Sequence, residues 1–329
     1  MSATTATDSA QLEASVHAGL RQAGFDGVPS ALEPVHGGHS GLTYRVAVGD
    51  HQFIVKAVPE GQRPVGRHDM LRQARILNAL AGTDVPVPIV RASREQGPDS
   101  GQGWFAMDLV RGESLEPVLD EPAVPAELAV ARMLRAAEVL PRLHRVPLDS
   151  LPIDGAPLWP RDELDRWART MDAVPAELVP HARELQERLA AHTPDPVEPV
   201  LIHGDYRLGN IISAGTEPAA IIDWEIWSPG DPRVELGWFL VFADGSNFPG
   251  VGRELTGLPS AEELVSRYLG DGPALPDFTW FDALGRFKMA AIMGHNLRRH
   301  REGRHHDPDQ EKLPATIERL LATGLERLR

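Results

Sequence analysis

One short segment constrains the fold of this chain more than any other. Residues 200–210 read Val-Leu-Ile-His-Gly-Asp-Tyr-Arg-Leu-Gly-Asn, so a hydrophobic strand ends in a polar loop that carries Asp205 and Asn210. A second hydrophobic strand, at 219–222, ends at Asp223. We expect these to be two adjacent strands, whose ends would bring three oxygen-bearing side chains together.

The residue types at these strand ends suit a particular chemistry. Hard cations such as Mg²⁺ prefer carboxylate and carbonyl oxygens, and Asn210 and Asp223 supply them. Asp205 then remains free to accept a proton from a substrate hydroxyl. The order His-x-Asp-x-x-x-x-Asn, followed later by a metal-binding Asp, is the template of kinase catalytic loops. The spacing therefore predicts phosphoryl transfer to a hydroxyl group.

Hydrophobic periodicity divides the chain into a part rich in strands and a larger helical part. Before residue 111 we expect helices at 8–23 and 65–80 and strands at 31–35, 42–48, 52–58, 87–92 and 104–110. Beyond it we expect helices at 126–143, 162–171, 177–191, 234–242, 261–269, 280–301 and 312–328. We place the boundary between the two parts at 110–112, giving domains 1–110 and 111–329. Ligand sites favour such boundaries.

Composition excludes several classes of protein. The 33 basic and 47 acidic residues among 329 give a net charge of −14, which argues against a nucleic-acid binder. The absence of cysteine excludes disulfides, thiol nucleophiles and cysteine-based metal sites. The N-terminus lacks the pattern of a signal peptide, and no apolar run is long enough to span a bilayer. We therefore expect a cytoplasmic protein without a membrane or nucleic-acid partner.

The motifs together resemble a known family. Residues 203–210 and 221–225, with Gly-Gly-His-Ser-Gly-Leu-Thr-Tyr-Arg-Val at 37–46 and Phe-Ile-Val-Lys at 53–56, are similar to the aminoglycoside phosphotransferase and choline kinase-like superfamily. The sequence at 205–210 most resembles that of the phosphotransferase domains linked to acyl-CoA dehydrogenases. The resemblance implies an α+β, bilobal protein-kinase-like fold, with a small antiparallel-sheet N-lobe and a larger, mainly helical C-lobe.

The resemblance also implies a nucleotide site. Lys56 would hold the α- and β-phosphates of ATP, and the glycine loop would cover the phosphates with its backbone amides. In that loop the implied contacts are Gly37, Gly38 and Ser40. The segment that contains Met107 and Leu109 would pair with the adenine edge. ATP and Mg²⁺ are thus the expected cofactors.

The implied catalytic groups lie in the loop after the first strand. Asp205 would be the base, Arg207 would offset charge on the transferred phosphoryl group, and Asn210 and Asp223 would hold Mg²⁺. A salt bridge inside the loop is the alternative role for Arg207. We expect Asp231 and Glu235 to support the loop by accepting hydrogen bonds from its backbone, and His203 to be a buried bracing residue.

One position departs from the family pattern. Relatives carry a glutamate in the helix after Lys56 that orients the lysine, and this chain has Gln73 there. Either Asp69 substitutes for the glutamate or the ion pair is missing. This departure keeps open a different class of function, a nucleotide-binding pseudokinase that acts as a regulatory module.

The acceptor stays open at this point. An acidic pocket would suit a polycationic, antibiotic-like amino sugar. The sequence at 205–210 and the arginines at 298–301 instead favour a hydroxyacyl-CoA or another anionic metabolite. A metal-dependent hydrolase is weaker, because few metal-binding oxygens and no histidine pair converge. In both kinase cases the partner is a small molecule with a hydroxyl group. The sequence does not decide between ATP and GTP, nor the oligomeric state.

Overall fold

The computed structural model describes residues 3–35, 42–59, 69–97, 101–120, 123–253, 255 and 257–329. The chain divides into two compact units. The first unit comprises Met1–Arg111 with Ser150–Asp154 and Ala219–Ile226, and the second comprises Gly112–Asp149, Gly155–Pro218 and Trp227–Arg329.

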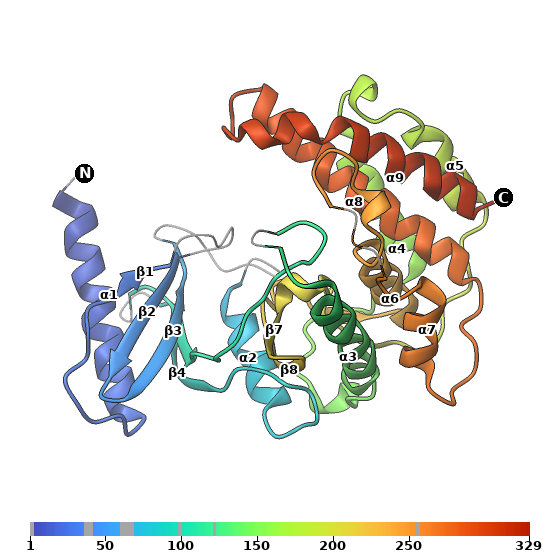
Figure 1. Ribbon diagram of the computed structural model, residues 1–329. Helices are drawn as coiled ribbons and strands as arrows, with labels where there is room; N and C mark the ends of the chain where they lie inside the picture. The colour runs from blue at the N-terminus through green and yellow to red at the C-terminus, as the bar shows by residue number, and fades with distance from the viewer. Residues whose placement is uncertain are drawn as a thin grey trace. The chain divides into compact units, whose positions relative to one another are not determined.

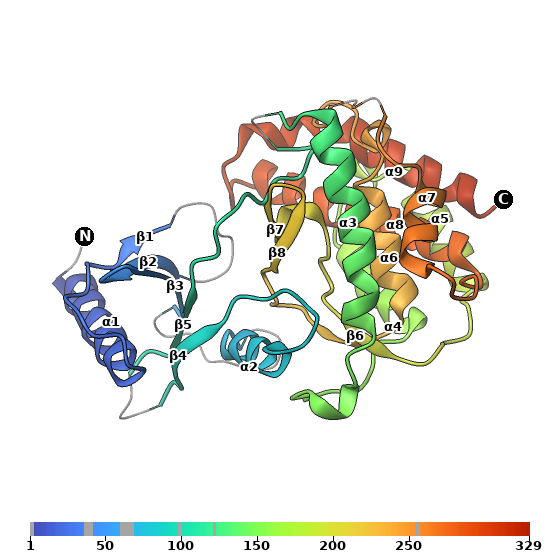
Figure 2. The same ribbon diagram turned by 60° about the horizontal axis from the view of Figure 1, so that its bottom comes forward.

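The first unit is built on a five-stranded antiparallel sheet with the strand order β1-β2-β3-β5-β4 (Figures 1 and 2). Its elements are α1 (Ala3–Gln22), β1 (Glu33–Pro34), β2 (Leu42–Val48), β3 (His51–Ala57), α2 (Leu71–Leu80), β4 (Val90–Arg94) and β5 (Trp104–Asp108). The hairpin between β2 and β3 turns at Gly49 and Asp50, as their turn-forming residue types predict.

The alternation of side chains along β3 separates the core of this unit from its polar face. Phe53, Val55 and Ala57 are fully buried and pack with the apolar face of α1. Because successive residues of a strand point to opposite faces, Lys56 lies on the other face of the sheet. That face carries α2, whose Gln73 reaches the Lys56 amine.

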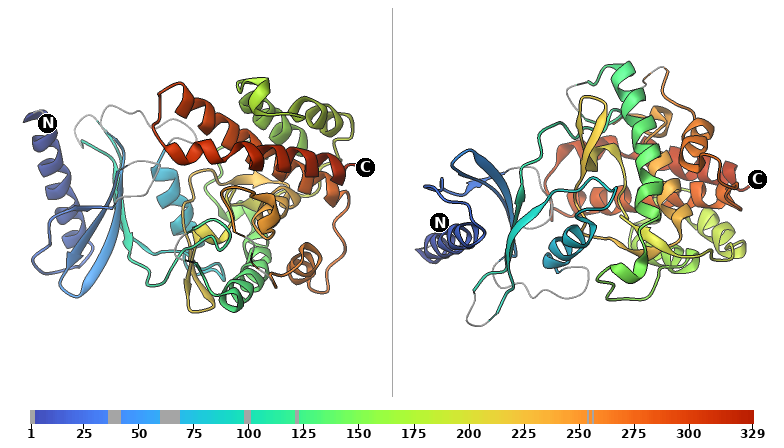
Figure 3. Two further views of the ribbon diagram at one scale, coloured as in Figure 1. Left: turned by 45° about the horizontal axis from the view of Figure 1, so that its top comes forward. Right: turned by 90° about the horizontal axis from the view of Figure 1, so that it is seen from below.

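The second unit is mainly helical. Its helices are α3 (Ala126–His144), α4 (Pro160–Asp172), α5 (Ala182–Ala191), α6 (Pro232–Val241), α7 (Ala261–Leu269), α8 (Phe278–Arg301) and α9 (Pro314–Arg327). Figure 2 shows α7 beside α3, and Figure 3 shows α9, in red, running along α8. Helix α8 packs against α4, α6 and α9, and its residues from Trp280 to Ala291 are all buried.

The close crossing of α6 and α8 depends on two glycines. A Cβ atom at Gly237 would lie 2.5 Å from the Phe281 carbonyl oxygen, and one at Gly285 would lie 2.8 Å from the Gly237 carbonyl oxygen. Both distances are shorter than van der Waals contact, so larger residues would push the helices apart. This crossing matters because both helices carry residues of the site described below.

Short strands complete the structure. Strand β6 (Val200–Ile202) pairs antiparallel with β9 (Ser228–Gly230), while β7 (Ile211–Ala214) and β8 (Glu217–Ile221) form a separate two-stranded sheet. The strands that precede Asp205 and Asp223 are β6 and β8, so the expectation that they are adjacent strands is wrong. The pattern did not reveal β9, because its sequence, Ser-Pro-Gly, is typical of a turn.

Most other elements agree with the sequence periodicity, and the α+β class is confirmed. The predicted helix at 177–191 is an exception, since it divides into a short 3₁₀ turn at Ala176–Leu178 and α5. His181, between them, has a φ of 69°, a left-handed conformation that a continuous helix does not allow. No helix in the described ranges is sufficiently long and apolar to span a membrane.

Candidate functional site

The loop that follows β6 holds the Asp205 carboxylate through both oxygens. Asp205 Oδ1 accepts a hydrogen bond of 2.9 Å from Trp238 Nε1, and Oδ2 accepts one of 2.7 Å from Asn210 Nδ2. The side chain remains 27% exposed. The carboxylate is therefore fixed in direction and is still open to a substrate.

Asn210 is oriented by the same loop. Its Nδ2 also donates to the Asp205 carbonyl oxygen at 2.9 Å, and the short 3₁₀ turn at Leu208–Asn210 brings the two residues together. Because the nitrogen end of the amide is engaged with Asp205, its Oδ1 atom is the end left to bind a cation. The separation of five positions between Asp205 and Asn210 thus has a local geometric reason.

Arg207 packs inside the loop. Its Nε lies 3.5 Å from Asp205 Oδ2, and a terminal nitrogen lies 3.8 Å from the Glu116 carboxylate. The guanidinium carbon is 5.6 Å from the centre of the Phe242 ring. The contact with Asp205 matches the alternative of a salt bridge within the loop, while the Arg207 side chain keeps 28% of its surface exposed.

The support predicted for the loop comes from Glu235 on α6. Its two carboxylate oxygens accept hydrogen bonds from the backbone amides of His203 and Gly204, at 2.9 and 2.7 Å. His144 contacts the same carboxylate at 3.2 Å. Asp231 instead pairs with Arg233 at 2.6 Å and caps the start of α6. The supporting role is confirmed for Glu235, and Asp231 holds the helix rather than the loop.

His203 is fully buried, as expected of a bracing residue. Its Nδ1 accepts a hydrogen bond of 3.2 Å from the Asp205 backbone amide. Tyr206, also fully buried, donates to the Ala136 carbonyl oxygen of α3 at 2.7 Å. The loop is therefore attached to the helices on both sides of Asp205.

Glu116 is a site residue that the sequence pattern did not indicate. It is fully buried and accepts a hydrogen bond of 3.2 Å from the Gly209 backbone amide. Burial raises its pKa to about 8, although the charge of Arg207 and the Gly209 amide oppose the shift. Its Oε1 atom has no hydrogen-bond partner within the described part of the chain. The carboxyl is thus mostly neutral at pH 7.

We expect the free energy of unfolding of Glu116→Gln, relative to that of the wild type, to be higher at pH 8.5 than at pH 5. The raised pKa means that the stabilising effect of neutral Glu116 is complete below its unfolded value of 4.5 and is lost as the pH rises toward 8. Glutamine does not titrate and still accepts from Gly209. Urea unfolding should show that the stability of the wild type falls between pH 5 and pH 8.5 and that the stability of the variant falls less. An equal difference at both values would contradict the prediction, and exposed Glu187→Gln is the control.

In the first unit, Lys56 is held between two partners. Its amine lies 3.1 Å from Asp223 Oδ1 and donates to Gln73 Oε1, also at 3.1 Å. The Lys56 side chain is 12% exposed and the Asp223 side chain 40%. Asp69 pairs with Arg75 and does not replace the glutamate of relatives. Gln73 therefore takes the orienting position without an opposing charge, and Asp223 supplies the carboxylate.

Of the other residues predicted to contact the nucleotide, the structure describes Met107 and Leu109. Met107 is buried in β5, where it pairs with Ile54 of β3. The Leu109 amide donates to the Gln52 carbonyl oxygen at 2.9 Å, so that donor is used within the first unit. Gly37, Gly38 and Ser40 lie outside the described residues.

The predicted metal-binding residues come from different units, Asn210 from the second and Asp223 from the first. In the described ranges, no group of three or more His, Asp or Glu side chains could hold a metal ion. An amide oxygen at Asn210 and a carboxylate at Asp223 are nonetheless the donor types that Mg²⁺ takes, since it keeps water and phosphate oxygens for its remaining positions.

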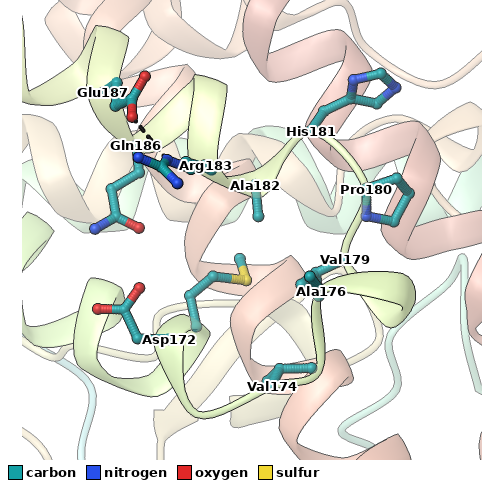
Figure 4. Close-up of a pocket in the computed structure, with 11 residues that line it drawn as sticks. Asp172, Val174, Ala176, Val179, Pro180, His181, Ala182, Arg183, Gln186 and Glu187 are labelled. Atoms are coloured by element: carbon teal, nitrogen blue, oxygen red, sulfur yellow. Dashed lines mark hydrogen bonds and ion pairs between the residues drawn. The ribbon is translucent and has the colours of Figure 1, made fainter.

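A pocket of about 490 Å³ lies elsewhere in the second unit, between the end of α4 and α5. Figure 4 shows small apolar side chains such as Val174, Val179 and Ala182 on one side and the paired Arg183 and Glu187 on the other. None of the predicted catalytic residues lines this pocket. Arg183 and Glu187 pair with each other at 2.9 Å, and Asp172 and His181 also line the pocket.

Comparison with known proteins places the chain among phosphotransferases. Residues 31–262 match the model of a family described as "Phosphotransferase enzyme family". Acyl-CoA dehydrogenase family member 11 from Gallus gallus is 30% identical over 312 residues, and that from Homo sapiens is 28% identical over 305 residues. Each match covers 88% of this chain and 39% of the relative, so the chain spans about two fifths of the relatives' length.

Solved structures share the fold. A candidate aminoglycoside phosphotransferase from Ralstonia eutropha has a TM-score of 0.78 at 22% identity, with 95% of this chain and 97% of that chain covered. A choline/ethanolamine kinase family protein from Mesorhizobium loti has a TM-score of 0.59 at 20% identity, with 98% and 99% covered. These likenesses confirm the kinase-like fold that the motifs imply.

Proposed function

We propose that this chain, which belongs to the phosphotransferase enzyme family, uses ATP and Mg²⁺ to phosphorylate a hydroxyl group of a small molecule. The observation that carries the proposal is the Asp205 carboxylate, which Trp238 and Asn210 hold in one direction while part of it stays exposed. A carboxylate so held can orient a hydroxyl and accept its proton.

Catalysis of this kind depends on positioning and charge, because the transition state for phosphoryl transfer is loose. Asp205 would orient the acceptor hydroxyl, and Arg207, within the same loop, would offset negative charge on the phosphoryl group. Lys56 would contact the nucleotide phosphates, together with the segment that contains Gly37, Gly38 and Ser40. The segment that contains Met107 and Leu109 would face the base.

The residues present suit a magnesium ion. Asn210 keeps its Oδ1 atom for a cation because its nitrogen is engaged with Asp205, and Asp223 adds a carboxylate. When bound, Mg²⁺ would offset the charge of the nucleotide phosphates. Neither residue would then need to move a proton, which leaves that role to Asp205.

A second candidate function differs in the acceptor. The curated relatives with 28–30% identity are named as acyl-CoA dehydrogenase family members, which favours a hydroxyacyl-CoA or another anionic metabolite over a polycationic sugar. The late arginines add little to this case. Arg301 pairs with Glu311 at 2.7 Å, and Arg298 lies 3.6 Å from Glu302.

The pseudokinase alternative rests on Gln73. Against it stands the Lys56 amine, which has a carboxylate partner in Asp223 despite the missing glutamate. An inactive module would have no need of Asp205, Asn210, Asp223 and Lys56 together. We therefore favour the active kinase.

A nucleotide-consumption assay over a panel of hydroxyl compounds tests the proposal. The panel includes amino sugars, amino alcohols, hydroxy acids and hydroxyacyl-CoAs, each with ATP or GTP, and with Mg²⁺ or EDTA. We expect turnover that needs Mg²⁺ and one acceptor class. Nucleotide binding without turnover in any arm would favour the pseudokinase, and magnesium-independent turnover would contradict the assigned roles of Asn210 and Asp223.

A further inference from the structure

Lysine is rare in this chain. Of its 33 basic residues, 30 are arginine and three are lysine, at positions 56, 288 and 312. Lys56 contacts Asp223, and Lys312 lies at the surface with 59% of its side chain exposed. Lys288 is 5% exposed, in the middle of α8. A buried, isolated lysine in a chain that otherwise uses arginine requires a structural or functional reason.

The surroundings of Lys288 connect it to the catalytic loop. Its amine donates a hydrogen bond of 2.7 Å to the carbonyl oxygen of Gly204, the residue before Asp205. It also lies 3.8 Å from the centre of the Trp238 ring and 5.3 Å from that of Trp167. The ammonium is thus held over aromatic faces that attract cations.

Lys288 contacts the loop at Gly204, a glycine with an unusual backbone conformation. The φ of this glycine is +86°, a conformation that glycine adopts readily and other residues rarely do. Glu235 holds its amide at 2.7 Å, and Lys288 holds its carbonyl, so the peptide groups on both sides of Gly204 are fixed. The second of these peptide groups leads directly into Asp205.

Trp238 completes the connection. Its ring faces the Lys288 amine, and its Nε1 donates to Asp205 Oδ1 at 2.9 Å. Removing the cation would release the Gly204 carbonyl and would take away the group against which the indole rests. Both changes would turn the Asp205 carboxylate.

On the basis of the proposed function, we propose that Lys288 is a positioning residue for phosphoryl transfer, which acts through Gly204 and Trp238 to fix the direction of the Asp205 carboxylate. It does not touch the acceptor or the nucleotide in this role. Arginine would place a larger, planar group in the same space, and lysine provides a compact point charge.

The position of Lys288 makes its charge sensitive to alkaline pH. Burial lowers its pKa to about 8, while the charges of Asp205, Glu163 and Glu235 oppose the shift and Arg166 adds to it. These groups face it from the catalytic loop, α4 and α6. Above pH 8 the amine loses its charge, and the bond to Gly204 loses its charge-assisted strength.

The test uses the full chain with Lys288→Met, Lys288→Arg and the surface control Lys312→Met. We expect Lys288→Met to lower kcat about 100-fold with an unchanged KM for nucleotide, because misplacing a catalytic group by about 1 Å costs that much. Wild-type kcat should fall above pH 8, and this fall should be absent in Lys288→Met and shifted to higher pH in Lys288→Arg. A folded Lys288→Met variant with wild-type kcat, or with the wild-type alkaline fall, would overturn the proposal.

A second readout does not depend on turnover. The chain has seven tryptophans, so the indole N–H signal of Trp238 can be assigned with Trp238→Phe and followed by NMR. We expect this signal to shift in Lys288→Met and to move with pH around 8 in the wild type. An unchanged signal in the variant would overturn the positioning role. A shifted signal in a protein that phosphorylates nothing would instead refute the proposed function and leave Lys288 as the residue that orients Asp205.

Discussion

Replacing Asp205 with alanine is expected to abolish phosphoryl transfer while the protein still binds ATP. The variant loses the carboxylate that would accept the proton of the acceptor hydroxyl, and a positioned acid or base contributes about 10²–10⁴-fold to the rate. Lys56, which is proposed to contact the nucleotide phosphates, lies in the first unit, and its contact with Asp223 does not involve Asp205. Nucleotide affinity should therefore change little.

The measurement pairs kcat from a coupled assay with ATP binding by calorimetry. Asp205→Asn refines it, because asparagine keeps the shape and can still accept from Trp238 but is a poor base. Both variants should lose activity to a similar degree. Asp309→Ala, at a site 76% exposed, is the surface control. Turnover close to that of the wild type in either Asp205 variant would remove the basis of the proposed mechanism.

Replacing Glu235 with alanine is expected to cause the largest loss of stability. Glu235 is buried at 1% exposure, and its removal leaves the amides of His203 and Gly204 without their acceptor. His144 loses its contact as well. Breaking a buried charged pair costs about 3–5 kcal/mol in free energy of unfolding, and stranded buried donors add to that cost.

The pH dependence of this loss follows from the pKa of Glu235. Burial by itself raises that pKa, but the hydrogen bond from His144, the charges of His144 and His203 and the His203 amide outweigh it, so the pKa is lowered overall. A lowered pKa means that the stabilisation is present above the unfolded value of 4.5 and is lost as the pH falls through the folded value. The difference in free energy of unfolding between the wild type and Glu235→Ala should thus be largest at pH 7 and should become smaller below pH 4.5.

Urea unfolding of the wild type and Glu235→Ala between pH 3.5 and pH 7 tests this. Glu235→Gln serves as the matched variant, because it preserves the volume and one acceptor but carries no charge, and it should be intermediate. A deficit that stays constant in acid would show that Glu235 acts by packing alone. A negligible deficit at pH 7 would contradict its role in holding the loop.

The spacing in the sequence anticipated the contacts within the loop because they are local. Asp205 and Asn210 are five positions apart, and one short turn is enough to join their side chains. Strand alternation likewise predicts that Lys56 faces away from the core residues Phe53 and Val55. Periodicity also located most of the helices, since each must bury one apolar face.

Spacing along the sequence could not predict the contacts that distant residues make with the loop. Trp238 is 33 positions from Asp205, Lys288 is 84 positions from Gly204, and Glu116 is 93 positions from Gly209. Trp238 lies in a helix whose residues are all buried, and nothing in the sequence marks it as a hydrogen-bond donor to Asp205. A lone lysine in the apolar pattern of α8 was the one available signal for Lys288.

The sequence by itself determined the succession of strands and helices, the catalytic loop and the membership of a phosphotransferase family, because these depend on neighbours along the chain. Tertiary structure decided which strands pair, as β6 with β9 shows, and which buried groups meet. It also decided the charge states of Glu116 and Lys288, since a pKa responds to burial and to nearby charges. Those surroundings exist only after distant segments have packed together.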